Sequence, residues 1–339
     1  MSFSIGIIGL PNVGKSTIFK ALTEKEVKIA PRPFTTIDPN VGKVAVPDKR
    51  LKSLSKIINP EKTTPTTIEF VDIAGLVKNA HKGEGLGNQF LSQIKSCDAI
   101  LQIVRAFDSP EIENVLKEIN PEKEIEVINL ELLMKDLETL KNIVSRLKKK
   151  GDLKKSEVLE NIENQINQGK LISEIDLTEQ EKIEIKEYQL LTTKPIIYIL
   201  NTNNKTSFTN PAFKHLVMNL KEEEELLELS EGEKEELELK SQLDRIILAC
   251  YEILNLITFF TVAGGKEVRA WTIVKNSKIP EAGGVVHSDF HDKFIKAEVI
   301  HWKELVLTSS WQKAKEKGLI KTVGKDYEVK DGDIIEFKI

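Results

Sequence analysis

A glycine-rich loop near the start of the sequence has the residue types that bind phosphate. Residues 9–17 read GLPNVGKST, in which four residues separate Gly9 from the run Gly14-Lys15-Ser16, the spacing of a P-loop. The glycines allow a tight turn that brings successive backbone N–H groups close to phosphate oxygens. Lys15 can reach the β- and γ-phosphates, and the Ser16 hydroxyl can bind Mg²⁺. An apolar run before the loop and a helix-forming run after it favour a nucleoside triphosphate site over a chance glycine turn.

A second candidate motif, DIAG, follows the apolar run TIEFV. The Asp72 carboxylate can hold Mg²⁺, usually through water, and the Gly75 N–H can meet a γ-phosphate. Between the two motifs, a threonine of the segment PFTTIDPNVG can complete the metal shell. Residues 79–88 are rich in glycine and suit a loop that orders when the γ-phosphate is present, although a passive loop fits the composition equally well.

The group that would orient the attacking water is missing from its usual place. Leu76 follows Gly75, where many related enzymes carry a glutamine. An aliphatic side chain cannot hydrogen-bond a water molecule, so either another group does this or hydrolysis is slow until a partner assists. His81 is one candidate, although a loop histidine is more often simply solvated. The catalytic role that we assign is that of Lys15, which stabilises the developing charge.

Composition and hydropathy narrow the class of protein. The chain has 339 residues, enough for two or three domains, and a net charge of −4, which gives no global basic field for nucleic acid. Cys97 and Cys250 lie far apart, which fits free thiols in a reducing compartment. No stretch reaches the ~18 apolar residues that a membrane helix needs. We therefore expect a soluble cytoplasmic protein.

The order of the apolar runs indicates the fold that positions these motifs. The runs TIEFV, AILQIV (99–104) and PIIYIL (195–200) alternate with helix-forming segments. This alternation predicts an α/β fold with a doubly wound parallel sheet, which binds ligands at the carboxyl ends of its strands. The P-loop and the DIAG motif both occupy such ends.

Several long strings together resemble one known family. GLPNVGKST, PFTTIDPN, DIAGLVKNAHKGEGLGNQFL, RAFD and NTNN are similar to the YchF family, the Obg-like ATPases of the P-loop GTPase class. The likeness continues to the end of the sequence through LITFFTVAGGKEVRAWTI and GKDYEVKDGDIIEFKI. It implies a G-domain (1–128 and 191–254), a helical coiled-coil insertion (129–190) and a C-terminal TGS domain of β-grasp fold (255–339). It also implies ATP hydrolysis in place of GTP hydrolysis, and association with ribosomes.

The resemblance carries functional residues over to matching positions. The phosphate-binding loop of the family matches Asn12, Val13, Gly14, Lys15, Ser16 and Thr17, and its magnesium ligands match Ser16 and Thr36. Phe107, in RAFD, matches an aromatic residue near the adenine, and Asn201 and Thr202 match the first two positions of the base-contacting motif. Asn12 stands where related P-loops hold a monovalent cation, so K⁺ is a candidate cofactor beside Mg²⁺.

The base-contacting motif departs from the pattern that selects guanine. GTP-selective relatives have Asn-Lys-x-Asp, and the family itself keeps a glutamate at the fourth position, whereas this sequence reads Asn201-Thr202-Asn203-Asn204. Without the carboxylate, the site loses the charge-assisted bidentate pair with guanine. We therefore predict ATP over GTP by about tenfold or more, since each ~1.4 kcal/mol is one decade. A shallow preference, with GTP as the alternative substrate, stays open.

Apolar residues three and four apart predict a helical hairpin in the insertion. They are Leu130, Leu133, Leu137, Leu140, Val144 and Leu147, followed by Leu159, Ile162 and Ile166. The connecting tip, KKKGDLKK (148–155), can contact the phosphate backbone of RNA, although a solvated end fits equally well. The acidic stretch 219–240 predicts a solvated helical surface without a catalytic role.

We expect the protein to be a monomer. The alternative function is a nucleotide-gated ribosome-binding module in which hydrolysis is incidental.

Overall fold

The chain forms two compact units. We describe it from a computed structural model that places residues 3–24, 40–73, 85–203 and 214–339. One unit, which we call the P-loop unit, comprises residues 3–42 and 69–243. The other, the tail unit, comprises residues 43–68 and 244–339. Residues 43–68 and 244–254 therefore pack with the tail, whereas the predicted boundaries place them in the G-domain.

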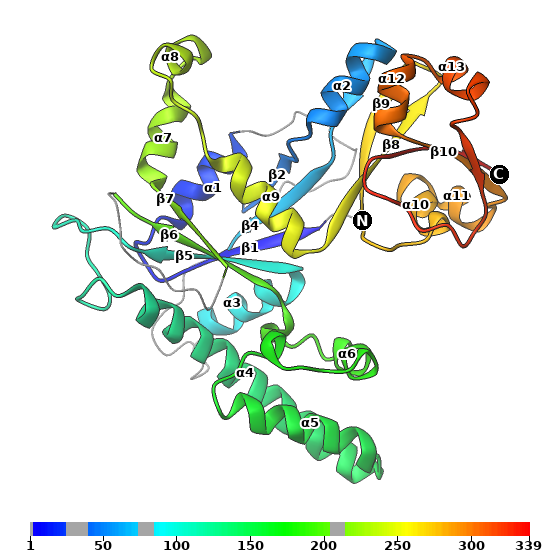
Figure 1. Ribbon diagram of the computed structural model, residues 1–339. Coiled ribbons are helices and arrows are strands. Elements are labelled where there is room, and N and C mark those ends of the chain that lie inside the picture. Colours follow the sequence, from blue (N-terminus) through cyan, green and yellow to red (C-terminus); the bar gives the residue numbers. More distant parts are fainter. Residues whose placement is uncertain (1–2, 25–39, 74–84, 204–213) are drawn as a thin grey trace. The chain divides into compact units, whose positions relative to one another are not determined.

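A largely parallel sheet forms the centre of the P-loop unit (Figure 1). Its strand order is β2-β4-β1-β5-β6-β7. The strands are β1 (Ser4–Ile8), β2 (Val41–Ala45), β4 (Thr67–Asp72), β5 (Ala99–Arg105), β6 (Ile196–Asn201) and β7 (His215–Met218). The pairs β1–β4, β1–β5, β5–β6 and β6–β7 are parallel, and β5 is buried along its whole length, as expected for a strand covered on both faces. The edge strand β2 runs antiparallel to β4, since the N–H of Asp72 donates to the carbonyl oxygen of Asn40 and the N–H of Val46 donates to that of Thr66. The predicted doubly wound sheet is confirmed, with this one antiparallel strand at its edge.

Helices cover both faces of this sheet. On one face lie α1 (Lys15–Thr23) and α7 (Leu220–Glu228), which α8 (Glu231–Glu236) follows, and on the other lie α3 (Gly85–Ser96) and α4 (Pro121–Lys150) (Figure 1). Strand β1 has β4 on one side and β5 on the other, so the order of strands reverses at β1. The crevice at such a reversal is where open α/β sheets bind ligands.

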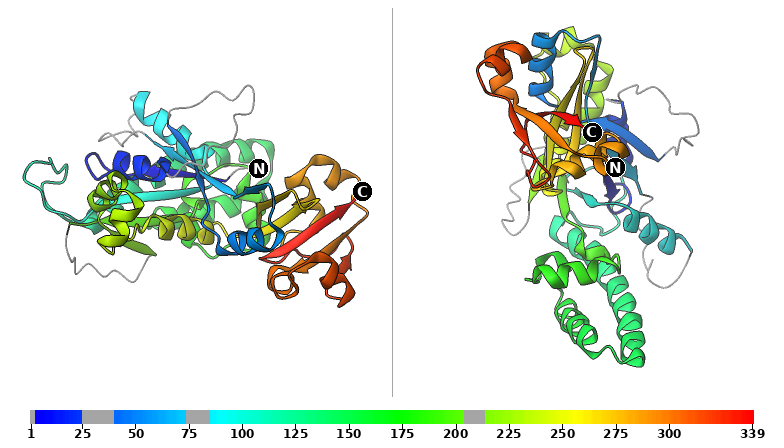
Figure 2. Two further views of the ribbon diagram at one scale, coloured as in Figure 1. Left: turned by 90° about the horizontal axis from the view of Figure 1, so that it is seen from above. Right: turned by 90° about the vertical axis from the view of Figure 1, so that its right-hand side faces the viewer.

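The predicted helical hairpin is present beyond the sheet. Helix α4 runs antiparallel to α5 (Leu153–Ile166), as two views show (Figures 1 and 2). Gly151 ends α4 with a φ of 78°, and the Asp152 side chain accepts a hydrogen bond from the N–H of Lys155 to begin α5. The chain returns through the short elements η2 (Ile172–Glu174), α6 (Glu179–Lys186) and η3 (Leu191–Thr193).

One residue of the predicted seam does not belong to it. Leu130 is 58% exposed, whereas Leu133 and Leu140 are buried in the core that α4 shares with α5. The reason is that α4 begins at Pro121 and its first turns pack on the sheet, with Ile125 in contact with a cluster that includes Val104. The same helix therefore serves two neighbours, and its apolar stripe changes direction near residue 130. The prediction for Leu130 is wrong.

The tail unit contains a mixed sheet with strand order β11-β10-β12-β8-β9-β3. The strands are β3 (Lys62–Thr64), β8 (Leu256–Ala263), β9 (Glu267–Val274), β10 (Lys296–His301), β11 (Lys321–Val323) and β12 (Asp333–Lys338). The helices are α2 (Lys49–Ile58), α9 (Leu243–Ile253), α10 (Ile279–Val286), α11 (Ser288–Asp292), α12 (Trp302–Thr308) and α13 (Trp311–Glu316). The pairs β8–β9, β10–β11 and β10–β12 are antiparallel, and β12–β8 and β3–β9 are parallel.

This second sheet has an apolar core on each face. Successive residues of a strand point to opposite faces, and the neighbours Phe259 and Phe260 accordingly belong to different cores. The core of Phe259 includes Ile279 of α10, and the core of Phe260 includes Leu51 and Leu54 of α2. The segment that precedes Asp72 in sequence therefore supplies part of the core of the tail unit.

A polar contact fixes the same segment. The Arg50 guanidinium donates to Asp48 at 2.8 Å and to Asp331 at 2.6 Å, and it lies 5.5 Å from the ring of Phe260. Asp331 in turn accepts a hydrogen bond from the N–H of Thr258 at 3.0 Å. Arg50 thus ties α2 to the C-terminal strands through a planar donor that suits two carboxylates.

None of the helices in the four described stretches of the chain has both the length and the hydropathy that crossing a bilayer requires.

Candidate functional site

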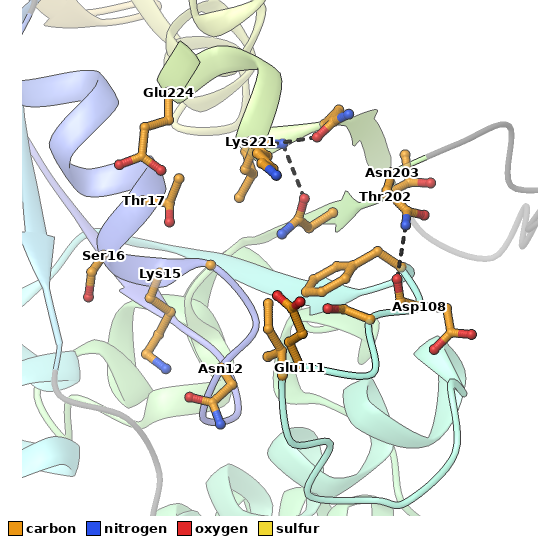
Figure 3. A pocket seen from close by; sticks show the side chains of 17 residues that line it. Asn12, Lys15, Ser16, Thr17, Asp108, Glu111, Thr202, Asn203, Lys221 and Glu224 are labelled. Carbon is orange, nitrogen blue, oxygen red and sulfur yellow. Dashed lines mark hydrogen bonds between the residues drawn. The ribbon is translucent and has the colours of Figure 1, made fainter.

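A cavity of about 700 Å³ lies in the P-loop unit at the carboxyl ends of β1, β5 and β6. Its walls come from the P-loop and the start of α1, from the segment after β5, and from the starts of the loop after β6 and of α7 (Figure 3). Lys15 and Ser16 lie toward one side, and Thr202, Asn203 and Asp108 lie toward the other (Figure 3). The volume is that of a site for a small organic ligand.

The loop between β1 and α1 has the tight backbone that its sequence predicts. Gly14 has a φ of 106°, and a Cβ on this residue would lie 2.8 Å from Asn201 Nδ2. A Cβ on Gly9 would lie 2.6 Å from the carbonyl oxygen of Ile103, so neither position has room for a side chain. Helix α1 begins at Lys15, which directs its unpaired N–H groups and the positive end of its dipole at the cavity.

Lys15 folds back over the P-loop. Its Nζ donates hydrogen bonds to the carbonyl oxygens of Gly9, at 3.1 Å, and of Leu10, at 2.8 Å. Burial lowers the pKa of Lys15, and the carboxylates of Asp72 and Glu124 oppose that effect. The Lys15 amine is therefore close to two acidic groups, at positions 72 and 124, that lie far apart in the sequence.

Asp72 is the described residue of the DIAG motif that can hold a metal. It ends β4, and its Cα pairs with Ile7 on the strand that leads into the P-loop. Burial raises the pKa of Asp72, and the charge of Lys15 opposes the rise. Ser16, the other described candidate ligand, is exposed at the start of α1. The structure thus brings the carboxylate to the P-loop, although it is not among the residues that line the cavity.

Some of the predicted site residues cannot be compared with the structure. Thr36, Gly75, Leu76, His81 and Asn204 lie outside the described residues, as does most of the loop at 79–88. Their roles stay predictions.

Asn201 contributes to the site by holding backbone. Its Nδ2 donates to the carbonyl oxygen of Val13 at 2.9 Å, and its Oδ1 accepts from the N–H of Leu220 at 3.1 Å. The side chain is buried and ties the P-loop to the start of α7. Thr202 is also buried, and its N–H donates to the carbonyl oxygen of Met218 at 2.8 Å. Both residues line the cavity with half-buried Phe107, so the structure brings the predicted base-side residues together.

Two walls of the cavity were not predicted from the sequence. The acidic stretch, predicted to be free of chemistry, contributes Asn219, Lys221 and Glu224, and the segment after RAF contributes Asp108 and Glu111. Both segments could have been predicted to line the site, because each follows a strand of the sheet at the end where ligands bind. Residues 219–240 were instead interpreted as a solvated surface because of their high charge.

Glu124 is a buried carboxyl group that sequence reasoning also missed. It lies in the first turn of α4, is 2% exposed, and accepts a hydrogen bond from the N–H of Arg105 at 2.9 Å. Burial raises the pKa of Glu124 to about 7, although the hydrogen bond and the charges of Arg105 and Lys15 favour the ionised form.

The raised pKa of Glu124 makes stability depend on pH. Between the unfolded value of 4.5 and the folded value of about 7, the folded protein binds more protons, so the free energy of unfolding falls as the pH rises through this range. The difference between the two pKa values corresponds to at most about 3 kcal/mol. Glu124→Gln keeps an oxygen for the Arg105 N–H, and we expect it to raise the free energy of unfolding at pH 8 by up to that amount, with a much smaller gain at pH 5.

Urea unfolding at the two pH values measures this difference. Glu122→Gln, an exposed position in the same turn, is the matched control and should change stability equally at both pH values. Parallel pH profiles for wild-type protein and Glu124→Gln would show that the carboxyl group is not the source of the dependence.

Comparison with known proteins agrees with this geometry. The family described as "50S ribosome-binding GTPase" matches residues 4–135, and the C-terminal YchF-GTPase family, described as "Protein of unknown function (DUF933)", matches residues 256–339. Proteins of Bacillus subtilis (strain 168) and Escherichia coli O157:H7, both named "Ribosome-binding ATPase YchF", are 42% and 44% identical to this chain. These alignments cover 100% and 99% of this chain and 99% of each relative.

A solved structure extends the likeness to the whole fold. The structure of the Schizosaccharomyces pombe YchF GTPase superposes with a TM-score of 0.88 at 36% identity, over 99% of this chain and 98% of that one. With similarity along the full chain in sequence and in fold, this protein belongs to the YchF family.

Proposed function

We propose that this protein is a Mg²⁺-dependent nucleoside triphosphatase of the cytoplasm that hydrolyses ATP to ADP and phosphate and acts as a nucleotide-controlled switch on the ribosome. The observation that carries the proposal is the P-loop, which opens onto a cavity of about 700 Å³ with Lys15 toward one side of it. The names of the B. subtilis and E. coli relatives support both the ATPase activity and the ribosomal partner.

In this proposal the chain's own groups stabilise the charge of the reaction. The triphosphate lies along the P-loop amides and the first turn of α1, and Lys15 Nζ exchanges the carbonyls of Gly9 and Leu10 for phosphate oxygens. When the bond between the β- and γ-phosphates breaks, charge develops on their oxygens, and the fixed amides and Lys15 stabilise it without reorganising. Asp72 and Glu124 favour the charged form of Lys15, as the chemistry requires.

The donor set at the P-loop fits magnesium. The Ser16 hydroxyl and the Asp72 carboxylate are hard oxygen ligands of the kind that Mg²⁺ prefers, and we propose Thr36 as a further ligand from its match to the family. When bound, Mg²⁺ neutralises charge on the β- and γ-phosphates. We also propose that Gly75 meets the γ-phosphate, and that K⁺ binds beside Asn12.

For the base we propose adenine, held by main-chain groups and an aromatic ring. The Asn201 amide already bonds to Val13 and Leu220, and we propose that main-chain carbonyl oxygens near Thr202 accept from the adenine amine, with Phe107 against the ring. GTP is the alternative. The S. pombe relative is described as a GTPase, and the carboxylates of Asp108 and Glu111 line the same cavity and can accept from guanine N–H groups.

The domain assignments complete the proposal. We propose a G-domain at residues 1–128 and 191–254, whose segments 43–68 and 244–254 pack within the tail unit, a coiled-coil insertion at 129–190 and a TGS domain of β-grasp fold at 255–339, in a monomer. The insertion and the tail would contact ribosomal surfaces, while the P-loop reports the nucleotide state.

Phosphate release from ATP, measured with and without ribosomes at several K⁺ concentrations, tests the function. We expect Mg²⁺-dependent release that ribosomes accelerate, because Leu76 offers no group to orient water and a partner would supply one. Hydrolysis that stays at a trace rate with ribosomes and K⁺ present, combined with nucleotide-dependent ribosome binding, would favour the rival non-catalytic module.

The lysine tip of the hairpin yields a test of the ribosomal partner. Lys148 is paired with Glu160 across the hairpin and is left unchanged. Replacing the four remaining lysines of the tip by glutamate should weaken co-sedimentation with ribosomes and reduce its dependence on salt, because each lost phosphate contact lowers the slope. These residues are Lys149, Lys150, Lys154 and Lys155.

A control with the same change of charge separates a local contact from a general effect. It reverses four exposed lysines elsewhere in the P-loop unit, namely Lys117, Lys141, Lys170 and Lys186. Equal co-sedimentation of the tip variant and wild-type protein would make the tip a solvated end of the hairpin.

A further inference from the structure

The segment after β5, which forms one wall of the cavity, folds around the buried side chain of Arg105. Arg105 is the last residue of β5 and is 2% exposed, and its guanidinium lies inside the turn made by residues 106–113. Nε donates to the carbonyl oxygen of Phe107 at 3.2 Å, and Nη1 donates to that of Glu113 at 3.1 Å. Nη2 donates to the carbonyl oxygens of Ile112, at 3.0 Å, and Ser109, at 3.4 Å.

The same guanidinium also supports the aromatic ring of this wall. Its Cζ lies 4.4 Å from the centroid of the Phe107 ring, within the range of a cation–π contact. A guanidinium presents its donors in a rigid planar fork, so it fixes the carbonyls and the ring together in a way that a lysine amine cannot. One face of the ring is thereby held, while Phe107 also lines the cavity.

Both ends of this wall are attached to the predicted nucleotide-binding motifs. Asn203 Nδ2 donates to the carbonyl oxygen of Asp108 at 3.0 Å, which joins the wall to the motif after β6. Asn12 Nδ2 donates to the carbonyl oxygen of Glu113 at 3.4 Å, which joins it to the P-loop. The position of the wall therefore sets the distance between the base side and the phosphate side of the cavity.

Glu124 of α4 contacts the backbone of Arg105. Its carboxyl group accepts the hydrogen bond of the Arg105 backbone N–H at 2.9 Å, which holds the end of β5 from α4. A buried arginine is tolerated when its donors are matched, and here four backbone carbonyls accept from the guanidinium.

We propose that Arg105 is a positioning residue for the base. It need not touch the nucleotide, and it acts by holding Phe107 and residues 108–113 in the shape that receives the base and by orienting the Phe107 ring. This inference rests on the proposed function and adds a residue that would control affinity for the nucleoside part of ATP, independently of the groups that bind its phosphates.

Comparison of ATP with a ligand that lacks the nucleoside tests this role. Inorganic tripolyphosphate fills the phosphate side alone, so its affinity should not depend on the wall that Arg105 holds. We expect Arg105→Met to raise the Kd of Mg²⁺-ATP by about tenfold or more, and that of Mg²⁺-tripolyphosphate by less than about twofold, in calorimetric titrations of the full chain. KM for ATP should rise with little change in kcat, because the phosphate-binding groups stay in place.

A milder variant keeps the test decisive if Arg105→Met does not fold. Asn203→Ala removes the exposed hydrogen bond to Asp108 and disturbs the same wall from outside the core, so a smaller selective loss of ATP affinity is expected. Arg105→Lys keeps the charge without the fork and should not restore ATP affinity.

The outcomes separate this inference from the function on which it rests. Equal losses of ATP and tripolyphosphate affinity, or no loss for either ligand, would overturn the role of Arg105. Wild-type protein that binds neither ligand would instead overturn the proposed nucleotide site.

Discussion

Replacement of Lys15 by alanine is expected to abolish ATP hydrolysis and to leave the fold intact. Lys15 is the cationic group that the P-loop places at the phosphates, and losing one such fixed donor lowers a rate by at least about a hundredfold. Its hydrogen bonds in the structure go to the Gly9 and Leu10 carbonyls, and burial disfavours its charge, so we expect its removal to cost little stability.

Phosphate release and thermal unfolding of the Lys15→Ala protein measure the two parts of this expectation. Lys52→Ala, at an exposed position of α2, serves as the control and should match wild-type protein in both assays. Wild-type rates of hydrolysis in Lys15→Ala would rule out the P-loop as the catalytic site.

The largest expected loss of stability outside the cavity comes from Asp136. This residue of α4 is 1% exposed, and its carboxylate accepts hydrogen bonds from the N–H groups of Leu191 and Thr192 at 2.7 and 2.8 Å, and from the Thr192 hydroxyl at 2.7 Å. Asp136→Ala would leave these buried donors unpaired, at about 1–3 kcal/mol each. We expect the free energy of unfolding to fall by about 3 kcal/mol or more.

The same variant separates a structural role from a functional one. Asp136 does not line the cavity, so the folded fraction of Asp136→Ala should hydrolyse ATP at the wild-type rate. Glu138→Ala, exposed on the same helix, is the control for urea unfolding. A change of less than about 1 kcal/mol for Asp136→Ala would mean that water replaces the carboxylate at this position.

The features that could be predicted from the sequence depend on short stretches of chain. The P-loop spacing, the strand before it and the helix after it are encoded within residues 4–23, and the structure has them there. The hairpin was also predictable, because its apolar positions repeat at helical spacing. Leu130 fits that spacing but lies on the part of α4 that packs beside the sheet, and no local pattern shows which neighbour a helix face meets.

What could not be predicted depends on contacts between distant residues. Residues 43–68 join the tail unit through a contact of Arg50 with Asp331, 281 positions away, and nothing in the local composition of α2 indicates this partner. Likewise Arg105 and Glu124 read as ordinary charged residues in the sequence, and their burial follows from where β5 ends and α4 begins. Lys221 and Glu224 lie among many other charged residues, so the sequence alone does not distinguish them as residues of the site.

The proposed function requires that the cavity bind a nucleoside triphosphate and prefer adenine. Equilibrium titration of labelled ATP and GTP against one preparation, with Mg²⁺ present, measures both properties. We expect ATP to bind more tightly by about tenfold or more, because position 204 offers guanine no carboxylate that could accept two hydrogen bonds. Tighter binding of GTP would contradict the assignment of the base and would point to Asp108 or Glu111 as the guanine acceptor, while the absence of binding for both nucleotides would contradict the P-loop site itself.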